Sequence, residues 1–420
     1  MNLNALAFTL HWPQTLSTPF HRLPANFTKQ GDDLRPRLPL ELCEVVIDYC
    51  RNDPRTLQTC SLACRAWVGR AQEHIFRRTR LPTSKLHSIH SLLTVNPALA
   101  TYVQHLNIDF GRADTLADVR DVLKRVCQQM QSVRTLELTG ISWHASLELN
   151  LLRTVLPTCT TRLELGTIAV APQAPLPELI ASFPLLQSLS LGDNLTSAHS
   201  ASTWEAAGPN TTRTRAPLRT LSLSLAFSNP AVLHYARWLA TGPHALDLRT
   251  LSIAFDYSGT RISAPALLGL LLENLCPPLE TLELAMARDT DLSIVPFTLE
   301  HATRLAHLRL LVKYSGSWTQ DSPSAVRNWV VTLLSRLHLQ SIRTIHLAIE
   351  EPGQEGYLLF DWVDDLVHAL LQCDELNSLE RITFESVGSC LASSDMASLE
   401  KRLDMLRQKT AIEHVLRLWP

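Results

Sequence analysis

The sequence is poor in glycine and lacks the short motifs that mark common catalytic sites. Only 14 of its 420 residues are glycine, which leaves little material for the loops that cradle phosphates. Nucleophile elbows, HExxH zinc motifs and paired CxxC motifs are also missing. The 16 histidines do not form a cluster. We therefore expect a protein that is not an enzyme and that needs no metal and no cofactor.

An excess of basic charge and long apolar runs are missing too, and each absence excludes a kind of partner. The chain has 38 Lys and Arg against 40 Asp and Glu, without the basic excess that neutralises nucleic-acid phosphates. The longest apolar stretch, residues 264–272, is interrupted by Glu273 and is shorter than the roughly 20 residues of a membrane span. We expect neither a nucleic-acid partner nor a membrane.

The cysteines indicate the compartment. Nine is an odd number, and four of them (Cys43, Cys50, Cys60 and Cys64) fall within one short helical stretch, which is untypical of a secreted disulfide framework. A reducing, intracellular location in the cytoplasm or nucleus fits better. Residues 1–37 carry several prolines and polar residues and are expected to form a disordered or poorly ordered tail.

Residues 38–80 predict a module of three short helices. Apolar residues recur at three- and four-residue spacing in two blocks, first at Leu42, Val45, Val46 and Tyr49, then at Leu57, Cys60, Cys64 and Trp67. Asp53 and Pro54 between the blocks are typical of a helix start. Such a small module buries too little surface to be stable alone, so we expect it to pack against a partner or against the next domain.

Within this module the segments LPLEL (38–42) and SLACRAW (61–67) resemble the F-box. The resemblance covers about a tenth of the chain and implies docking on a Skp-type adaptor of cullin-based ubiquitin ligases. The positions that match the family either pack internally or contact the adaptor: Leu38, Pro39, Leu42, Val46, Leu57, Cys60, Ser61, Leu62, Cys64 and Trp67. The same residues would also suit the core of a plain helical bundle, and the sequence does not divide them between the two roles.

Beyond a predicted helical connector (81–102), one phrase of the type LxxLxL returns ten times across residues 103–420. Its copies begin at residues 103, 133, 160, 186, 218, 248, 279, 305, 342 and 379. The mean period is about 31 residues, within the range that signals a solenoid. Amphipathic segments between the phrases, for example 116–130, 147–156, 231–239, 266–275, 325–337 and 360–371, predict helices.

Leucine alternates with polar residues inside these phrases, as in Leu136-Glu137-Leu138 and Leu308-Arg309-Leu310. One face of each strand must then meet water, whereas strands covered by helices on both sides are apolar throughout. The phrases resemble leucine-rich repeats, and the longer LxxLxLxxN pattern is complete from Leu186 to Asn194. The predicted fold is therefore α/β: an irregular leucine-rich-repeat-like solenoid of parallel strands plus helices, preceded by the three-helix F-box module.

The wet face of this sheet is the place where a solenoid would hold another protein. Candidate contact residues lie between the leucines or in two polar insertions, 193–217 and 315–323: Glu137, Glu164, Glu283, Arg309, His346, Trp204 and Trp318. A plain solvated β-surface explains any one of them equally well, and a tryptophan in a loop more often folds back onto its own repeat.

These features lead to one functional hypothesis and two alternatives. The first is a substrate-recruiting subunit whose F-box binds a Skp-type adaptor, and through it a cullin, while the solenoid binds an unknown substrate protein. The second is a leucine-rich-repeat scaffold or signalling module, with no ubiquitin role, whose amino-terminal helices only cap the first repeat. The third, more remote, is a compact α/β enzyme.

Overall fold

The computed structural model describes residues 39–111, 120–143, 154–166, 168–170, 176–192, 195–197, 218–226, 248–256, 272, 278–287, 302–313, 341–350, 378–387, 401, 404 and 413–419. They belong to two compact units. The first takes in the described residues up to Ile141 and those of Leu147–Thr160, and the second takes in those of Ser142–Ser146 and Thr161–Pro420.

Three helices open the first unit, as the apolar spacing predicted: α2 (Leu40–Tyr49), α3 (Pro54–Ala63) and α4 (Arg65–Arg77). The start of α3 is fixed by Asp53, whose carboxylate accepts hydrogen bonds from the backbone N–H groups of Arg55 and Thr56 at 3.0 and 3.2 Å. Pro54 follows at the first helical position, where its missing N–H costs nothing. The predicted tail, residues 1–37, lies outside the described residues.

Three parallel strands of the main sheet complete the first unit. They follow one another in the order β1 (Arg78–Pro82), β2 (His105–Asp109) and β3 (Thr135–Thr139). The connecting elements are η1 (Thr83–Lys85), α5 (Leu86–Val95), α6 (Ala98–Tyr102) and α7 (Arg120–Gln129). Strand β1 has no LxxLxL phrase and was not predicted. It continues directly from α4, and its Leu81 pairs with Ile108 in register, with both side chains fully buried.

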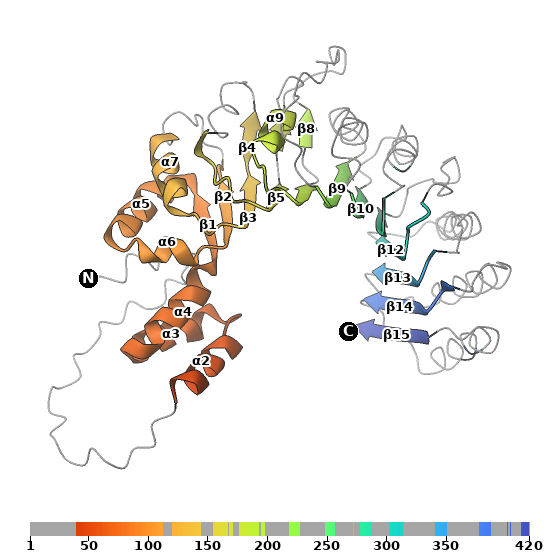
Figure 1. Cartoon of the computed structure of the whole chain (residues 1–420), viewed down its shortest axis with the longest axis horizontal. Helices are drawn as coiled ribbons and strands as arrows, with labels where there is room; N and C mark the ends of the chain where they lie inside the picture. Colours follow the sequence, from red (N-terminus) through yellow and green to blue (C-terminus); the bar gives the residue numbers. More distant parts are fainter. Residues whose placement is uncertain are drawn as a thin grey trace, which may run out of the picture. The chain divides into compact units, whose positions relative to one another are not determined.

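The second unit repeats the same strand many times. Its strands are β5 (Arg162–Leu165), β7 (Ser188–Leu191), β9 (Thr220–Ala226), β10 (Thr250–Asp256), β11 (Thr281–Ala287), β12 (His307–Lys313), β13 (Thr344–Glu350), β14 (Arg381–Val387) and β15 (Glu413–Trp419). They run parallel and neighbour one another in chain order, so that each repeat adds one strand (Figure 1). Helix α9 (Leu176–Ala181) lies between β5 and β7 in sequence.

The register aligns the leucines of successive repeats into one buried ladder. Leu221 pairs with Leu251, which pairs with Leu282, and that residue pairs with Leu308, all at most 1% exposed. The residues between the leucines are at least partly exposed, so one face of each strand is packed and the other meets water.

This is the predicted leucine-rich-repeat-like α/β architecture. All ten phrases contain a strand that begins two residues into the phrase, and β15 adds one that no phrase marked. Of the predicted helices between the phrases, 116–130 contains α7. The segments 231–239, 325–337 and 360–371 lie outside the described residues, as do most of 147–156 and 266–275.

Glycines end the short strands of the early repeats. Gly140 follows β3 and has φ +72°, a left-handed conformation that favours glycine. Beyond such corners run three-residue strands of a second sheet, ordered β4 (Ile141–Trp143), β6 (Ile168–Val170) and β8 (Leu195–Ser197). From β9 onward the strands are seven residues long.

We expect Gly140→Ala to lower the free energy of unfolding by about 3 kcal/mol, the upper end of the range for a strained backbone position. An added Cβ would lie 2.8 Å from the backbone nitrogen of Gly111, besides meeting the unfavourable φ. Gly111→Ala is the matched control. Its φ is +59° but its Cβ would meet nothing within 4 Å, so only about 1 kcal/mol should be lost. Equal losses in urea unfolding would contradict the close approach of the two turns.

Candidate functional site

Helix α2 carries apolar side chains on two sides, and only one side is buried. Cys43 and Ile47 face inward. On another side Leu42, Val45, Val46 and Tyr49 follow at spacings of three and four residues, and the structure leaves them between 49% and 86% exposed. We call these four residues the α2 face. Apolar side chains gathered on one exposed surface are typical of a protein-docking site.

The core that holds the α2 face in place comes from all three helices. Ile47, Leu57, Cys60 and Ala71 form a buried cluster, against which Trp67 packs with Cys50 and Ile75. Burial raises the pKa of the Cys60 thiol, and the nearby Cys50 raises it further. Cys60 is therefore a neutral packing group at physiological pH and not a nucleophile.

The structure thus divides the residues that carry the F-box resemblance. Leu57 and Cys60 are core residues, Trp67 packs against that core, and the hydroxyl of half-buried Ser61 donates to the carbonyl of Gln58 at 2.7 Å. The exposed members are Pro39, Leu42, Val46, Leu62 and Cys64. Leu38 lies outside the described residues. Two members of the α2 face, Val45 and Tyr49, were missing from the predicted site, although the helical period marks both.

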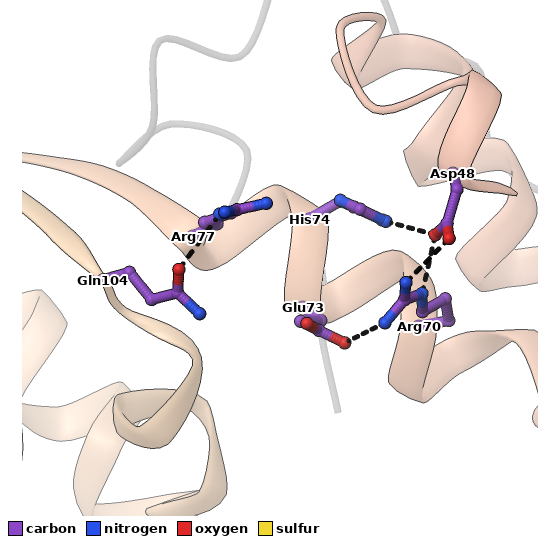
Figure 2. Close-up of polar contacts among 6 residues, drawn as sticks. All are labelled: Asp48, Arg70, Glu73, His74, Arg77 and Gln104. Atoms are coloured by element: carbon purple, nitrogen blue, oxygen red, sulfur yellow. Dashed lines mark hydrogen bonds and ion pairs between the residues drawn. The ribbon is translucent and has the colours of Figure 1, made fainter. Parts of the chain in front are cut away.

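An ionic clamp joins α2 to α4 (Figure 2). Arg70 of α4 donates from Nε and Nη2 to the two carboxylate oxygens of Asp48, at 2.6 and 2.7 Å. Nε2 of His74 lies 2.7 Å from the same carboxylate, and a third nitrogen of Arg70 donates to Glu73 at 2.8 Å. The two-pronged bond to Arg70, and after it the bond to His74, holds the pKa of Asp48 well below its usual range. Asp48 is therefore a carboxylate at neutral pH, and His74 donates to it.

Removing this clamp should loosen α2. Asp48→Asn is expected to lower the free energy of unfolding of the helical module by about 1 kcal/mol at neutral pH, a modest value because both partners are partly solvated. A carboxylate with a depressed folded pKa stabilises the fold above its unfolded pKa of about 4, and this stabilisation is lost as the pH falls towards the folded pKa. The difference from the wild type should therefore shrink below about pH 4.

Urea unfolding across that pH range measures this effect, with Glu44→Gln, an exposed carboxylate on the same helix, as the matched control. A stability difference that stayed constant down to strongly acidic pH would show that the ionised Asp48 carboxylate does not hold the helices together.

The wet face of the second unit places four predicted residues at one register position. Glu283 pairs with Arg309 and Arg309 with His346 on successive strands, and Glu164 occupies the equivalent place on β5. Arg309 Nη1 lies 3.4 Å from Glu283 Oε1, and His346 Nε2 lies 2.7 Å from Glu385 Oε2. Arg309 therefore has a neighbour of opposite charge, and His346 has a carboxylate beside it.

The other predicted contact residues lie elsewhere. Glu137 is on β3 of the first unit, with its Oε2 3.5 Å from His105 Nε2. Trp204 and Trp318 are outside the described residues. In the described part of the chain, no group of three or more His, Cys, Asp or Glu side chains could hold a metal ion. None of the described helices has the length and apolar character of a membrane span.

The parallel strands in chain order, preceded by three helices, define an α/β leucine-rich-repeat-like protein with an amino-terminal helical module. A scan against protein-family models found no match. A search of curated proteins found none either. Among solved structures, the chain resembles one in the crystal structure of the Rad7 and Elc1 complex from yeast, at 12% identity and a TM-score of 0.37, over 88% of this chain and 91% of that one. A likeness this remote says nothing about what the present chain binds.

Proposed function

We propose that the chain is a substrate-recruiting subunit of a Skp-cullin-F-box-type ubiquitin ligase. The observation that carries the proposal is the α2 face, an exposed apolar surface on the helix where the F-box-like segment begins. A helix of ten residues cannot be stable in water by itself, and α2 leaves much of its apolar surface unburied. A partner that covers this surface would exclude it from water and stabilise the module.

Each part of the chain then has a separate task. Leu57, Cys60 and Trp67 shape the helical module, and its exposed apolar residues contact the adaptor, which brings the cullin. The wet face of the solenoid holds the substrate protein. Ubiquitin transfer belongs to other subunits, so the chain requires no catalytic residue, metal or cofactor, and it works inside the cell, in the cytoplasm or nucleus.

Co-purification with the adaptor tests the proposal. The full chain and a Skp-type adaptor, expressed together, are expected to elute as one complex in size-exclusion chromatography and to bind in calorimetry with a negative heat-capacity change, the signature of apolar burial. A folded chain that elutes separately from the adaptor at micromolar concentration would overturn it.

One observation favours the second candidate, a scaffold whose helices cap the solenoid. Helix α4 passes directly into β1, and the backbone N–H of Gln104, just before β2, donates to the carbonyl of Arg77 at 3.1 Å. The Arg77 side chain also donates to the side-chain oxygen of Gln104 at 3.1 Å (Figure 2). The carboxyl-terminal end of α4 is therefore joined to the first strands of the sheet.

A truncated chain separates the two candidates. It should begin at Arg78, because a start near residue 90 would also remove β1 and expose the edge of β2. If the helices only cap the solenoid and have no ubiquitin role, the truncated chain should aggregate and the full chain should not bind the adaptor. The ligase proposal predicts that the full chain binds the adaptor and that the truncated chain does not.

A further inference from the structure

The wet face of the second unit contains a neutral area made of hydroxyl side chains. On β7, β9 and β10 the first and third residues of each strand are partly exposed serines and threonines: Ser188, Ser190, Thr220, Ser222, Thr250 and Ser252. We call these six residues the hydroxyl platform. Register pairs Ser188 with Thr220 and Ser190 with Ser222. Thr220 and Ser222 pair in turn with Thr250 and Ser252, so that the six residues form two straight rows across three strands.

The platform is open and firmly supported. All six side chains are partly exposed, and the leucines that alternate with them, Leu189, Leu221 and Leu251, are fully buried. Small hydroxyl side chains leave the strands accessible, and they can donate hydrogen bonds to an acceptor lying across them. The nearest carboxylates in the row, Glu164 and Glu283, each have an arginine at 2.8 and 3.4 Å respectively.

Two arginines stand side by side at the amino-terminal edge of the platform. Arg219 and Arg249 directly precede β9 and β10, both side chains are exposed, and the backbone N–H of Arg249 donates to the carbonyl of Arg219 at 2.8 Å. Neighbouring strands are about 4.8 Å apart, and like charges directly opposite each other are unfavourable. Arg249 has one acidic neighbour, Glu280, at 3.4 Å. No ion pair of Arg219 is found within the described residues.

We propose that the hydroxyl platform and the pair Arg219 and Arg249 bind an acidic segment of a partner protein, one with several Asp or Glu residues. Two adjacent guanidinium groups supply the charge that complements carboxylates, and hydroxyls supply further donors beside them. The inference builds on the proposed function, because the acidic segment would belong to the recruited substrate. Two cations on a chain of net charge -2 are too few for nucleic acid, which requires a longer basic track.

A carboxylate-rich segment fits this edge better than a single phosphate group. Arg249 already shares its charge with Glu280, so the two guanidinium groups have different surroundings and do not form one symmetric pocket. Separate carboxylates along an extended segment can meet the two arginines one by one, while polar backbone groups lie over the hydroxyls.

Fluorescence anisotropy with the full chain and no adaptor tests the inference. The probe is a labelled peptide of alternating glutamate and serine, compared with its glutamine counterpart, with a peptide carrying one phosphoserine among neutral residues, and with a short oligothymidylate. We expect the chain to prefer the glutamate peptide, and we expect this binding to weaken as salt increases. Arg219→Gln should weaken it about tenfold and the double variant with Arg249→Gln about a hundredfold, because a charge-assisted hydrogen bond is lost each time.

Arg343→Gln is the matched control, since Arg343 precedes β13 in the same way, is also exposed and lies 3.9 Å from Glu380. It should leave the affinity unchanged, and all variants should melt like the wild type. Equal binding of the glutamate and glutamine peptides, an equal loss in Arg343→Gln, or tighter binding of the phosphopeptide or the oligothymidylate would overturn the inference. Because the adaptor is absent from the assay, the result is independent of whether the adaptor binds.

Discussion

Val46→Glu is expected to weaken binding of the Skp-type adaptor at least about a hundredfold while the chain stays folded. The side chain is 50% exposed in the free protein, so a carboxylate there can remain hydrated. In the complex the same position would be covered by apolar surface, and an unpaired buried charge costs about 3 kcal/mol or more. Every 1.4 kcal/mol corresponds to a tenfold change in affinity. Titration calorimetry with the purified adaptor measures the change.

The chain offers a close control in Val95→Glu. Val95 is also an exposed helical valine of the first unit, at 59%, but it lies in α5 and outside the α2 face. Its substitution should alter adaptor affinity less than twofold, which is within the range of surface substitutions. If Val46→Glu bound the adaptor as tightly as Val95→Glu, the adaptor would have to use another surface, and the ligase proposal would lose its main support.

The solenoid could be predicted from the sequence because its signal is repeated and local. Each leucine pair, such as Leu282 and Leu284, shows by itself which side of its strand is buried, and the register confirms that neighbouring repeats agree. The strands β1 and β15 were missed because neither contains the phrase. Strand β1 can be recognised only in the folded structure, where it pairs with β2 and its Leu81 lies beside Ile108.

The site was harder to predict because helical periodicity marks apolar residues without saying which are covered. Val46 and Ile47 are consecutive and chemically similar, yet one is half exposed and the other is 1% exposed. The clamp had no sequence signal at all. Asp48 lies 22 residues from Arg70 and 26 from His74, and only the packing of α2 on α4 brings these charges together. That these surfaces bind an adaptor and a substrate stays a prediction.

The residues that carry the F-box resemblance are divided into buried and exposed ones, and this predicts opposite effects for two leucines of α3. Leu57 is 1% exposed in the core and Leu62 is 54% exposed. Leu57→Ala should therefore destabilise the helical module by about 2–5 kcal/mol, the cost of lost burial together with the cavity that remains. Leu62→Ala removes exposed surface only and should change stability by no more than about 0.5 kcal/mol.

Amide hydrogen exchange can measure both variants, because it reports opening of α3 and α4 separately from unfolding of the solenoid. Protection in these helices should fall at least about thirtyfold in Leu57→Ala, as a loss of 2 kcal/mol implies, and should be retained in Leu62→Ala. A weaker complex with the adaptor would then have different causes in the two variants: an unfolded module in the first and a missing contact in the second. Equal loss of protection in both would mean that Leu62 belongs to the core, and the docking surface would shrink to α2 alone.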